Sequence, residues 1–151
     1  LRGESKIQKE KITIKPEDLT KPEEAAEFAE KTGLDRFAGA YGNSHGISID
    51  EPALDIERIK AVRKILPERV AMVLHGGSGI PDNEIKEALK AGIANIHVNT
   101  EIRTAYAGAL RKFLAENPDE TTPYKILASS VEAVKAKVEE KLRLFNSVNK
   151  V

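Results

Sequence analysis

From residue 22 onward, the apolar positions of the chain recur every three or four residues in five stretches, which is the spacing of helices with one buried face. Proline favours the first turn of a helix and glycine its end. The pattern therefore predicts helices that start at Pro22 and Pro81 and end at Gly33 and Gly92. It predicts further helices over residues 53–66, from Thr100 to about residue 115, and over residues 124–147.

Apolar residues that share a helix face are expected to be buried against the rest of the fold. In the first four helices these faces carry Ala25, Phe28 and Ala29; Ile56, Ile59, Val62 and Leu66; Ile85, Ala88 and Leu89; and Ile102, Ala105, Tyr106, Ala109, Leu110 and Phe113. The last helix has the spacing of a peripheral or partner-facing helix, with Val131, Val134, Val138, Leu142 and Phe145.

Three short apolar runs between the helices predict strands, at residues 37–41, 70–74 and 93–98. Strands that alternate with helices indicate a parallel sheet with right-handed connections. A complete eight-stranded barrel needs about 250 residues, so three strand–helix units make slightly under half of one. The low strand count and the absence of an initiator methionine favour a partial (β/α)8 barrel of the α/β class over a small, flavodoxin-like open sheet.

The expected organisation is one portion of a single barrel domain that spans residues 1–151. Residues 1–20 form an irregular polar lead-in, residues 21–115 hold the strand–helix units, and residues 124–147 form a helical tail.

The amino-acid composition excludes several classes of function and site. The 151 residues carry 24 basic and 24 acidic side chains, a balance that argues against a nucleic-acid surface. The chain has no cysteine, so a metal site would use His, Asp or Glu. Its apolar runs are too short for a membrane span and no signal-like segment opens it, so a cytoplasmic location is the default expectation.

All three histidines of the chain, His45, His75 and His97, follow predicted strands. Neighbouring strands lie about 4.8 Å apart, so imidazoles at adjacent strand ends are expected within reach of one ion. A catalytic zinc has three protein ligands and an open position. A single histidine in a glycine-rich loop is more often a structural hydrogen-bonding group, but three at equivalent strand ends favour a metal or ligand site at the carboxyl edge of the sheet.

In residues 95–99, the polar residues Asn95, His97 and Asn99 share one face of the predicted strand, and the apolar residues occupy the other. The polar row is expected to face the barrel interior. Burying these polar side chains is costly unless they are hydrogen-bonded or meet a ligand. The two interpretations of the row are therefore a substrate contact and an internal polar network.

The segment Gly76-Gly77-Ser78-Gly79 lies just before a predicted helix start, and Thr100 precedes another. Exposed backbone N–H groups at such points attract phosphate, and the loops after the last two strands of a barrel are its recurrent phosphate site. A tight turn is the alternative for the glycine-rich segment.

Three segments carry a family resemblance: residues 42–46 (GNSHG), 74–81 (LHGGSGIP) and 98–103 (VNTEIR). Together with residues 116–119 and 143–145 they resemble the class II fructose-bisphosphate and tagatose-bisphosphate aldolases. The likeness covers residues 20–147. It implies a zinc-dependent (β/α)8 barrel, of which this chain would be the last three strand–helix units plus the C-terminal helix.

By that resemblance, His45 and His75 correspond to zinc ligands. The positions that correspond to contacts with the dihydroxyacetone-phosphate part of the substrate are Gly46, Gly76, Gly77, Ser78, Asn99 and Thr100. Backbone atoms near Gly46 and Gly76 correspond to a monovalent cation site for K⁺ or Na⁺. His97 stands where the family usually has Asn, so we expect it to hydrogen-bond substrate; a replaced metal ligand and a changed substrate preference are the alternatives.

The resemblance implies aldol cleavage and condensation in carbohydrate metabolism such as glycolysis, with fructose 1,6-bisphosphate giving dihydroxyacetone phosphate and glyceraldehyde 3-phosphate. Tagatose 1,6-bisphosphate is the alternative substrate, and a phosphate-binding or assembly module without catalysis is the alternative class. The family's catalytic aspartate and a further zinc histidine have no match here and are expected upstream of Leu1. The chain alone is therefore expected to be inactive, to bind zinc weakly, and to associate through exposed edges, while the whole enzyme is expected to be a homo-oligomer without nucleic-acid or membrane partners.

Overall fold

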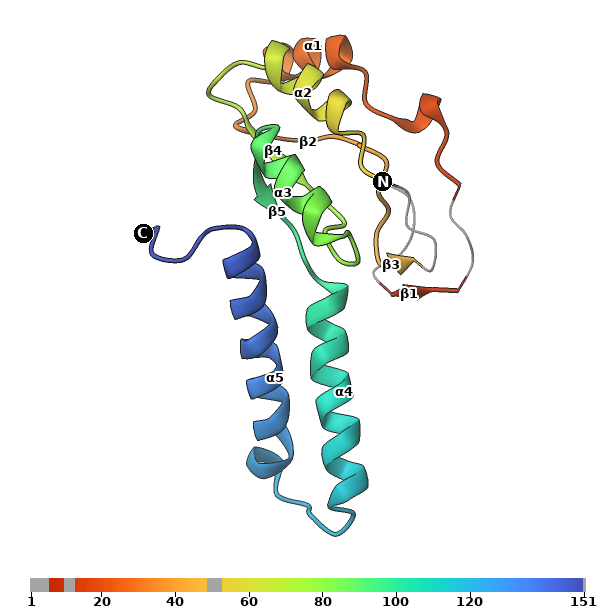
Figure 1. Cartoon of the computed structure of the whole chain (residues 1–151), viewed down its shortest axis with the longest axis vertical. Helices are drawn as coiled ribbons and strands as arrows, with labels where there is room; N and C mark the ends of the chain where they lie inside the picture. Colours follow the sequence, from red (N-terminus) through yellow and green to blue (C-terminus); the bar gives the residue numbers. More distant parts are fainter. Residues whose placement is uncertain (1–5, 10–12, 49–52, 151) are drawn as a thin grey trace. The chain divides into compact units, whose positions relative to one another are not determined.

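The computed structural model describes residues 6–9, 13–48, 53–150, and the chain divides into two compact units, Leu1–Asn99 and Thr100–Val151. The first unit holds a parallel sheet with its helices, and the second is a helical hairpin (Figure 1). Within the first unit the elements are β1 (Ile7–Gln8), a 3-10 turn η1 (Pro16–Asp18), α1 (Pro22–Thr32), β2 (Arg36–Ala38), β3 (Ile47–Ser48), α2 (Ile56–Ile65), β4 (Ala71–Leu74), α3 (Asp82–Lys90) and β5 (Ile93–Ile96).

The predicted helices of this unit are confirmed, with boundaries that have local causes. Helix α1 begins at Pro22 and ends at Gly33, whose φ of 65° is the left-handed conformation that glycine adopts without strain. The Asp55 side chain accepts a hydrogen bond from the Arg58 backbone N–H, which caps α2 three residues later than the sequence pattern indicates.

The predicted strand over residues 37–41 is too long at its end, because β2 stops at Ala38. Beyond it, Ala40 exchanges hydrogen bonds with Thr20, through its backbone N–H to Thr20 Oγ1 and through its carbonyl to the Thr20 N–H. The Tyr41 carbonyl accepts from the Asp55 N–H at 2.7 Å. These backbone groups therefore bond to the lead-in and to the cap of α2 instead of to a neighbouring strand.

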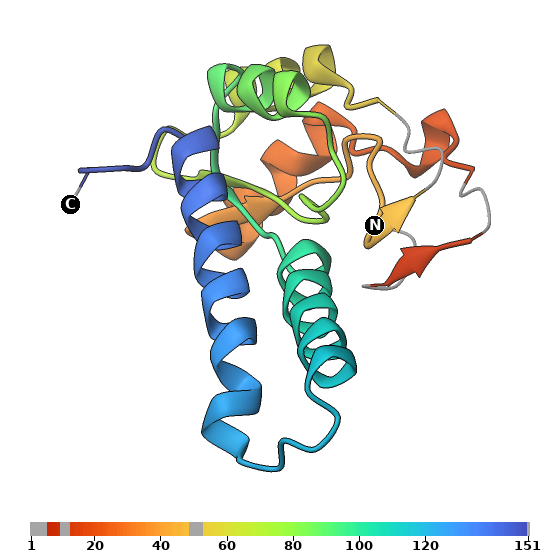
Figure 2. The ribbon, with the colours of Figure 1, turned by 60° about the horizontal axis from the view of Figure 1, so that its bottom comes forward.

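The main sheet has the strand order β2–β4–β5, all parallel, with Phe37 beside Met72 and Met72 beside Ile93. Its order follows the chain, whereas a doubly wound sheet reverses direction and places helices on both faces. Right-handed connections in one direction put the linking helices on a single face, as in a barrel. Helices α1, α2 and α3 indeed pack against one another in sequence (Figure 2). A separate parallel pair, β1 with β3, was not predicted.

The core of the first unit is made of fully buried side chains from the sheet and its helices, among them Tyr41, Ile59, Val62, Val70, Met72, Leu74 and Ile85. The face predicted for α1 is partly wrong. Ala25 and Ala29 are buried, but Phe28 is 54% exposed. Helix α1 packs against α2, and its buried side chains are those of Ala25 and Ala29, so its buried face is narrower than the sequence pattern predicts.

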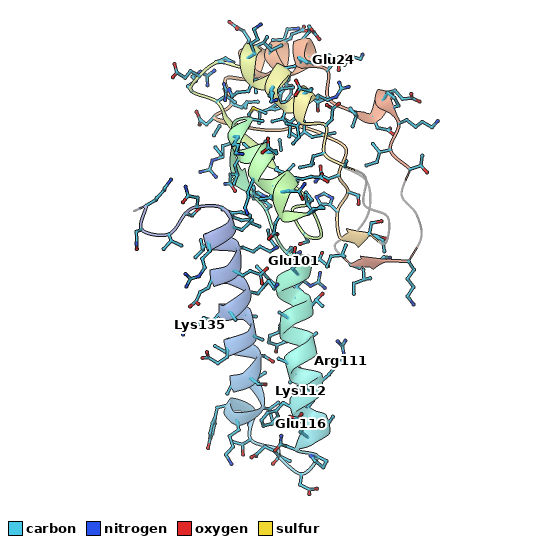
Figure 3. All side chains as sticks on the ribbon, in the orientation of Figure 1. Glu24, Glu101, Arg111, Lys112, Glu116 and Lys135 are labelled. Carbon is cyan, nitrogen blue, oxygen red and sulfur yellow. The ribbon has the colours of Figure 1, made fainter. Side chains whose placement is uncertain are left out.

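The second unit consists of α4 (Thr100–Glu116) and α5 (Pro123–Leu144), which pack side by side (Figure 1). Glu101 lies at the start of α4 (Figure 3), and its carboxylate is 2.6 Å from Lys141 Nζ and 3.8 Å from Lys137 Nζ. The Glu101 and Lys141 side chains are only 15% and 11% exposed, so this ion pair is largely screened from water.

The apolar face predicted for α4 is only partly buried, whereas the exposed face of α5 is as expected of a peripheral or partner-facing helix. Among its described residues, the buried ones are Thr100, Ser130 and Lys141, and none is a large apolar one. The exposed large apolar residues include Tyr106 and Leu114 on α4 and Tyr124, Leu127, Val131, Val138 and Leu142 on α5. The hairpin thus has little core of its own. None of the helices in the described ranges is both long and apolar enough to cross a membrane.

Arg63 closes the turn between α2 and β4, and its replacement tests how much that turn contributes to stability. Its guanidinium donates to the carbonyls of Leu66, Pro67 and Val70 at 2.7–2.9 Å. Lysine cannot span three acceptors, so we expect Arg63→Lys to lower the free energy of unfolding by about 2 kcal/mol. Urea unfolding of Arg63→Lys beside Arg36→Lys, at an exposed strand residue, gives the comparison. Equal stability of the two variants would contradict the expectation.

The buried Tyr41 makes the free energy of unfolding depend on pH. Burial raises the pKa of its hydroxyl to about 12, above the value near 10 of an unfolded chain. The folded state therefore holds this proton more tightly, and stability that is present below pH 10 is lost as the pH rises from 10 to 12. We expect the unfolding free energy of wild type to fall more steeply over that range than that of Tyr41→Phe. Parallel slopes in pH-dependent urea unfolding would rule this out.

Candidate metal and phosphate site

The three predicted histidines gather where the strands of the main sheet end. The ring centroids of His45 and His75 are 6.0 Å apart and nearly perpendicular, at 88°. The rings of His75 and His97 are 4.4 Å apart at 72°. Parallel strands direct the loops after β2, β4 and β5 to the same edge, so residues separated by 52 positions of sequence (97 minus 45) form one cluster.

The separations of the imidazole rings can be compared with the separation of two rings that bind one zinc ion. With nitrogen–zinc bonds of 2.0–2.1 Å in a tetrahedral site, the centroids of two ligating rings lie roughly 5 Å apart. The separations of His45 from His75 and of His75 from His97 are both within about 1 Å of that value, so distance alone does not single out one pair. The pKa of His75 is lowered, first by burial and then by the neighbouring His97 and His45, which favours the neutral imidazole that binds metal.

Two imidazoles leave a catalytic zinc short of one protein ligand. Across the described residues, no group of three or more His, Asp or Glu side chains has the arrangement of a metal site. His97 lies beside His75 and yet does not complete one.

Backbone hydrogen bonds hold the loops after β4 and β5 together beyond the ends of the strands. The His97 N–H donates to the Leu74 carbonyl, and the Gly77 N–H donates to the His97 carbonyl, both at 2.9 Å. One step further, the Asn99 N–H donates to Ser78 Oγ at 3.3 Å. The predicted substrate positions Gly77, Ser78, His97 and Asn99 are therefore brought together.

The glycines of this edge are explained first by close approach of the backbone. Gly76 has a φ of 67°, and a Cβ there would collide with the Ser44 carbonyl oxygen. A Cβ on Gly77 would lie 2.6 Å from Ile96 Cγ2. Gly46 has a φ of 104° and is buried. These positions require glycine whether or not a phosphate binds, so their role as substrate contacts stays a prediction.

The strand β5 ends at Ile96, so His97 and Asn99 of the predicted polar row lie just beyond it. His97 and Asn99 are exposed, and Asn95 is half-buried. These residues were predicted to face the barrel interior, but the described part of this chain does not bury His97 and Asn99. Thr100, the remaining predicted position, is the first residue of α4 and is buried.

Asn43 is a site residue that the sequence reasoning passed over. Its side chain is 1% exposed, and its Nδ2 donates to the carbonyls of His75 at 2.5 Å and Gly76 at 3.2 Å. The signal available in the sequence was its place two residues before His45 in a glycine-bounded loop, but an asparagine there is equally typical of an ordinary turn.

Comparison with known proteins agrees with this fold and identifies a family. The family model described as fructose-bisphosphate aldolase class-II matches residues 2–150. The chain belongs to the class II fructose-bisphosphate aldolase family, which confirms the resemblance drawn from residues 42–46, 74–81 and 98–103.

A sulfofructosephosphate aldolase from Alkalicoccus urumqiensis is 40% identical over 141 residues, which are 92% of this chain and 48% of that protein. The crystal structure of the YdjI aldolase from Escherichia coli K12 is 40% identical with a TM-score of 0.74, and the match covers 87% of this chain and 47% of that one. A putative fructose-1,6-biphosphate aldolase from Coccidioides immitis is 29% identical with the same TM-score, over 87% and 45% of the two chains.

The chain thus spans about half the length of the relatives that it matches. Its parallel α/β architecture is that of part of the aldolase barrel, and the partial-barrel prediction is confirmed. The likeness to these aldolase structures favours the partial barrel over the open-sheet alternative.

Proposed function

We propose that this chain forms part of a zinc-dependent aldolase that cleaves or forms a ketose phosphate containing a dihydroxyacetone-phosphate moiety. The observation that carries the proposal is the pairing of His45 and His75 at the carboxyl edge of the sheet, at a separation that suits one zinc ion. Zinc bound there supplies a Lewis acid for the substrate carbonyl. In the family, the metal works with loops that bind the phosphate group of the substrate. The segment of residues 76–79 and the start of α4 at Thr100 are their counterparts here.

The residues of the chain divide this work by position. His45 and His75 hold the metal through neutral imidazoles. Gly76, Gly77 and Ser78, with the start of α4 at Thr100, supply the N–H and hydroxyl groups that hold a phosphate in register. Gly46, Asn99 and His97 complete the contacts to the three-carbon ketose part. Backbone atoms near Gly46 and Gly76 hold a K⁺ or Na⁺ ion.

Fructose 1,6-bisphosphate is the proposed substrate, with tagatose 1,6-bisphosphate as the closest alternative. The name of the Alkalicoccus relative adds a sulfofructose phosphate as a third candidate. All three share the ketose phosphate end that the residues above would contact. Fructose and tagatose 1,6-bisphosphate differ only in configuration at C4, in the half of the sugar beyond the cleaved bond, and this chain contacts no atom of that half in the proposal. His97 is the residue of this chain whose identity departs from the family pattern, and it serves as a hydrogen-bond donor to substrate.

The general base for the substrate hydroxyl and a third zinc ligand belong to a part of the enzyme that precedes this chain, so the chain alone is inactive. The whole enzyme is a cytoplasmic homo-oligomer of carbohydrate metabolism, without nucleic-acid or membrane partners. The exposed apolar side chains of α5 support association. A non-catalytic phosphate-binding module is the alternative from another class.

Metal titration tests the ligand pair. We expect the chain to bind one Co²⁺, as a spectroscopic substitute for Zn²⁺, weakly, and His45→Ala or His75→Ala to reduce that affinity at least tenfold, because one imidazole then remains. Absorption-monitored titration gives the affinity, with His97→Asn as the matched control. Tight binding that His97→Asn abolishes would instead make His97 the third ligand. Equal affinities of wild type, His45→Ala and His75→Ala would overturn the proposed site.

Substrate choice is tested on the longer protein that carries the barrel's other strands. We expect it to cleave fructose 1,6-bisphosphate with the highest kcat/KM, and chelation of zinc to abolish the activity. The assay compares three substrates: fructose 1,6-bisphosphate, tagatose 1,6-bisphosphate and a sulfofructose phosphate. The 151-residue chain serves as the negative control. Cleavage of none of them by the zinc-loaded protein would favour the non-catalytic module.

A further inference from the structure

One buried side chain connects the backbones that carry the two proposed zinc ligands. Asn43 lies in the loop after β2, two residues before His45. Its Nδ2 donates to the carbonyl of His75 itself and to that of Gly76. The two N–H bonds of one amide group are therefore both used to hold the loop of one ligand to the other ligand's backbone.

The surroundings make this connection short and hard to replace. Gly76 approaches so closely that a Cβ there would lie 3.0 Å from Asn43 Nδ2 and would collide with the Ser44 carbonyl oxygen. Asn43 and Ser44 are both fully buried. Among the described residues, Asn43 Oδ1 has no hydrogen-bond partner, so the side chain is held in place by its donor end. Burial of the amide is offset by those two bonds alone.

The main sheet does not by itself set the distance between the two histidines. The β2–β4 pairing ends at Ala38 and Val73, and His45 follows seven residues after that last pair. His75 follows its own strand directly. On the His45 side, the intervening loop must be fixed by contacts of its own, and the Asn43 amide provides one that reaches His75.

We propose that Asn43 is a positioning residue, which sets the separation of the His45 and His75 rings and thereby the affinity of the metal site. The inference rests on the proposed function, because it takes these two histidines as the metal ligands. Asn43 does not touch the metal or the substrate. It acts through the backbone of His75 and through the path of the loop that ends in His45.

Asn43→Asp is the sharpest variant, because it keeps the shape and replaces the donor with a carboxylate oxygen that repels the two carbonyls. Asn43→Ser retains one shorter donor and serves where the aspartate variant fails to fold. Asn117→Asp is the matched control, since Asn117 also donates to a backbone carbonyl, that of Phe113 at 3.0 Å, but is exposed and lies outside the site.

We expect Asn43→Asp and Asn43→Ser to lower the affinity of the chain for Co²⁺ by about 10- to 100-fold and to shift the visible absorption bands of the bound ion, as for other residues that orient metal ligands. In the metal-free chain, the nuclear Overhauser contact between the His45 and His75 rings is expected to weaken. Contacts between β2 and β4, such as Phe37 with Met72, should remain. Asn117→Asp should change none of these.

An unchanged affinity, spectrum and ring contact in a folded Asn43 variant would overturn the proposal. A loss of metal binding that only follows the fraction of unfolded chain, with the spectrum of the bound ion unchanged, would also overturn it, since Asn43 would then be merely structural. If wild-type chain binds Co²⁺ no better than His45→Ala, the proposed function fails. The ring contact of the metal-free chain still decides whether Asn43 positions the histidines.

Discussion

The parallel pairing of β4 with a neighbour on each side is the constraint from which the rest of the first unit follows. β2 and β5 flank β4 in chain order, so every connection runs in the same direction. Right-handed crossovers then place the helices in one layer and the loops after the strands at one edge. The core residues Met72 and Leu74 come from β4, and His75 follows it directly.

The edge itself is organised by close backbone contact rather than by side-chain packing. Gly76 and Gly77 leave no room for a Cβ, and this allows the loops after β2, β4 and β5 to come within hydrogen-bonding distance of one another. Polar groups that would be costly to bury find partners there, as the Asn43 amide N–H groups and the Ser78 hydroxyl do. The same close approach carries the three imidazoles into one cluster.

The two units differ in how their apolar residues are used. The first unit buries side chains from helices and strands alike, whereas the hairpin of α4 and α5 exposes most of its large apolar residues. Its Glu101–Lys141 ion pair is nearly buried, which gives the hairpin a specific contact but little hydrophobic stabilisation. Tyr124, Val131, Val138 and Leu142 follow a spacing that is typical of a helix packed against another surface.

The spacing of apolar residues and the positions of proline and glycine were sufficient to predict the five helices, the three strands of the main sheet and their order along the chain. Pro22, Gly33 and Gly92 mark boundaries because proline and glycine restrict or release the backbone locally, whatever surrounds them. The glycine and histidine segments were sufficient for the family and for the place of His45, His75 and His97 at strand ends. These features depend on interactions between residues near in sequence, or on motifs that can be read directly.

Tertiary structure decided what depends on partners distant in sequence. β2 ends at Ala38 because Ala40 and Tyr41 bond to Thr20 and Asp55, and Phe28 is exposed beside the buried Ala25 and Ala29 of α1. The role of Asn43 appears only when the loop after β2 meets His75, 32 residues later. The sequence determined which chemical groups are present and on which elements they lie. The long-range contacts decided which of these groups meet, because a hydrogen bond between residues distant in sequence produces no repeating pattern in the sequence.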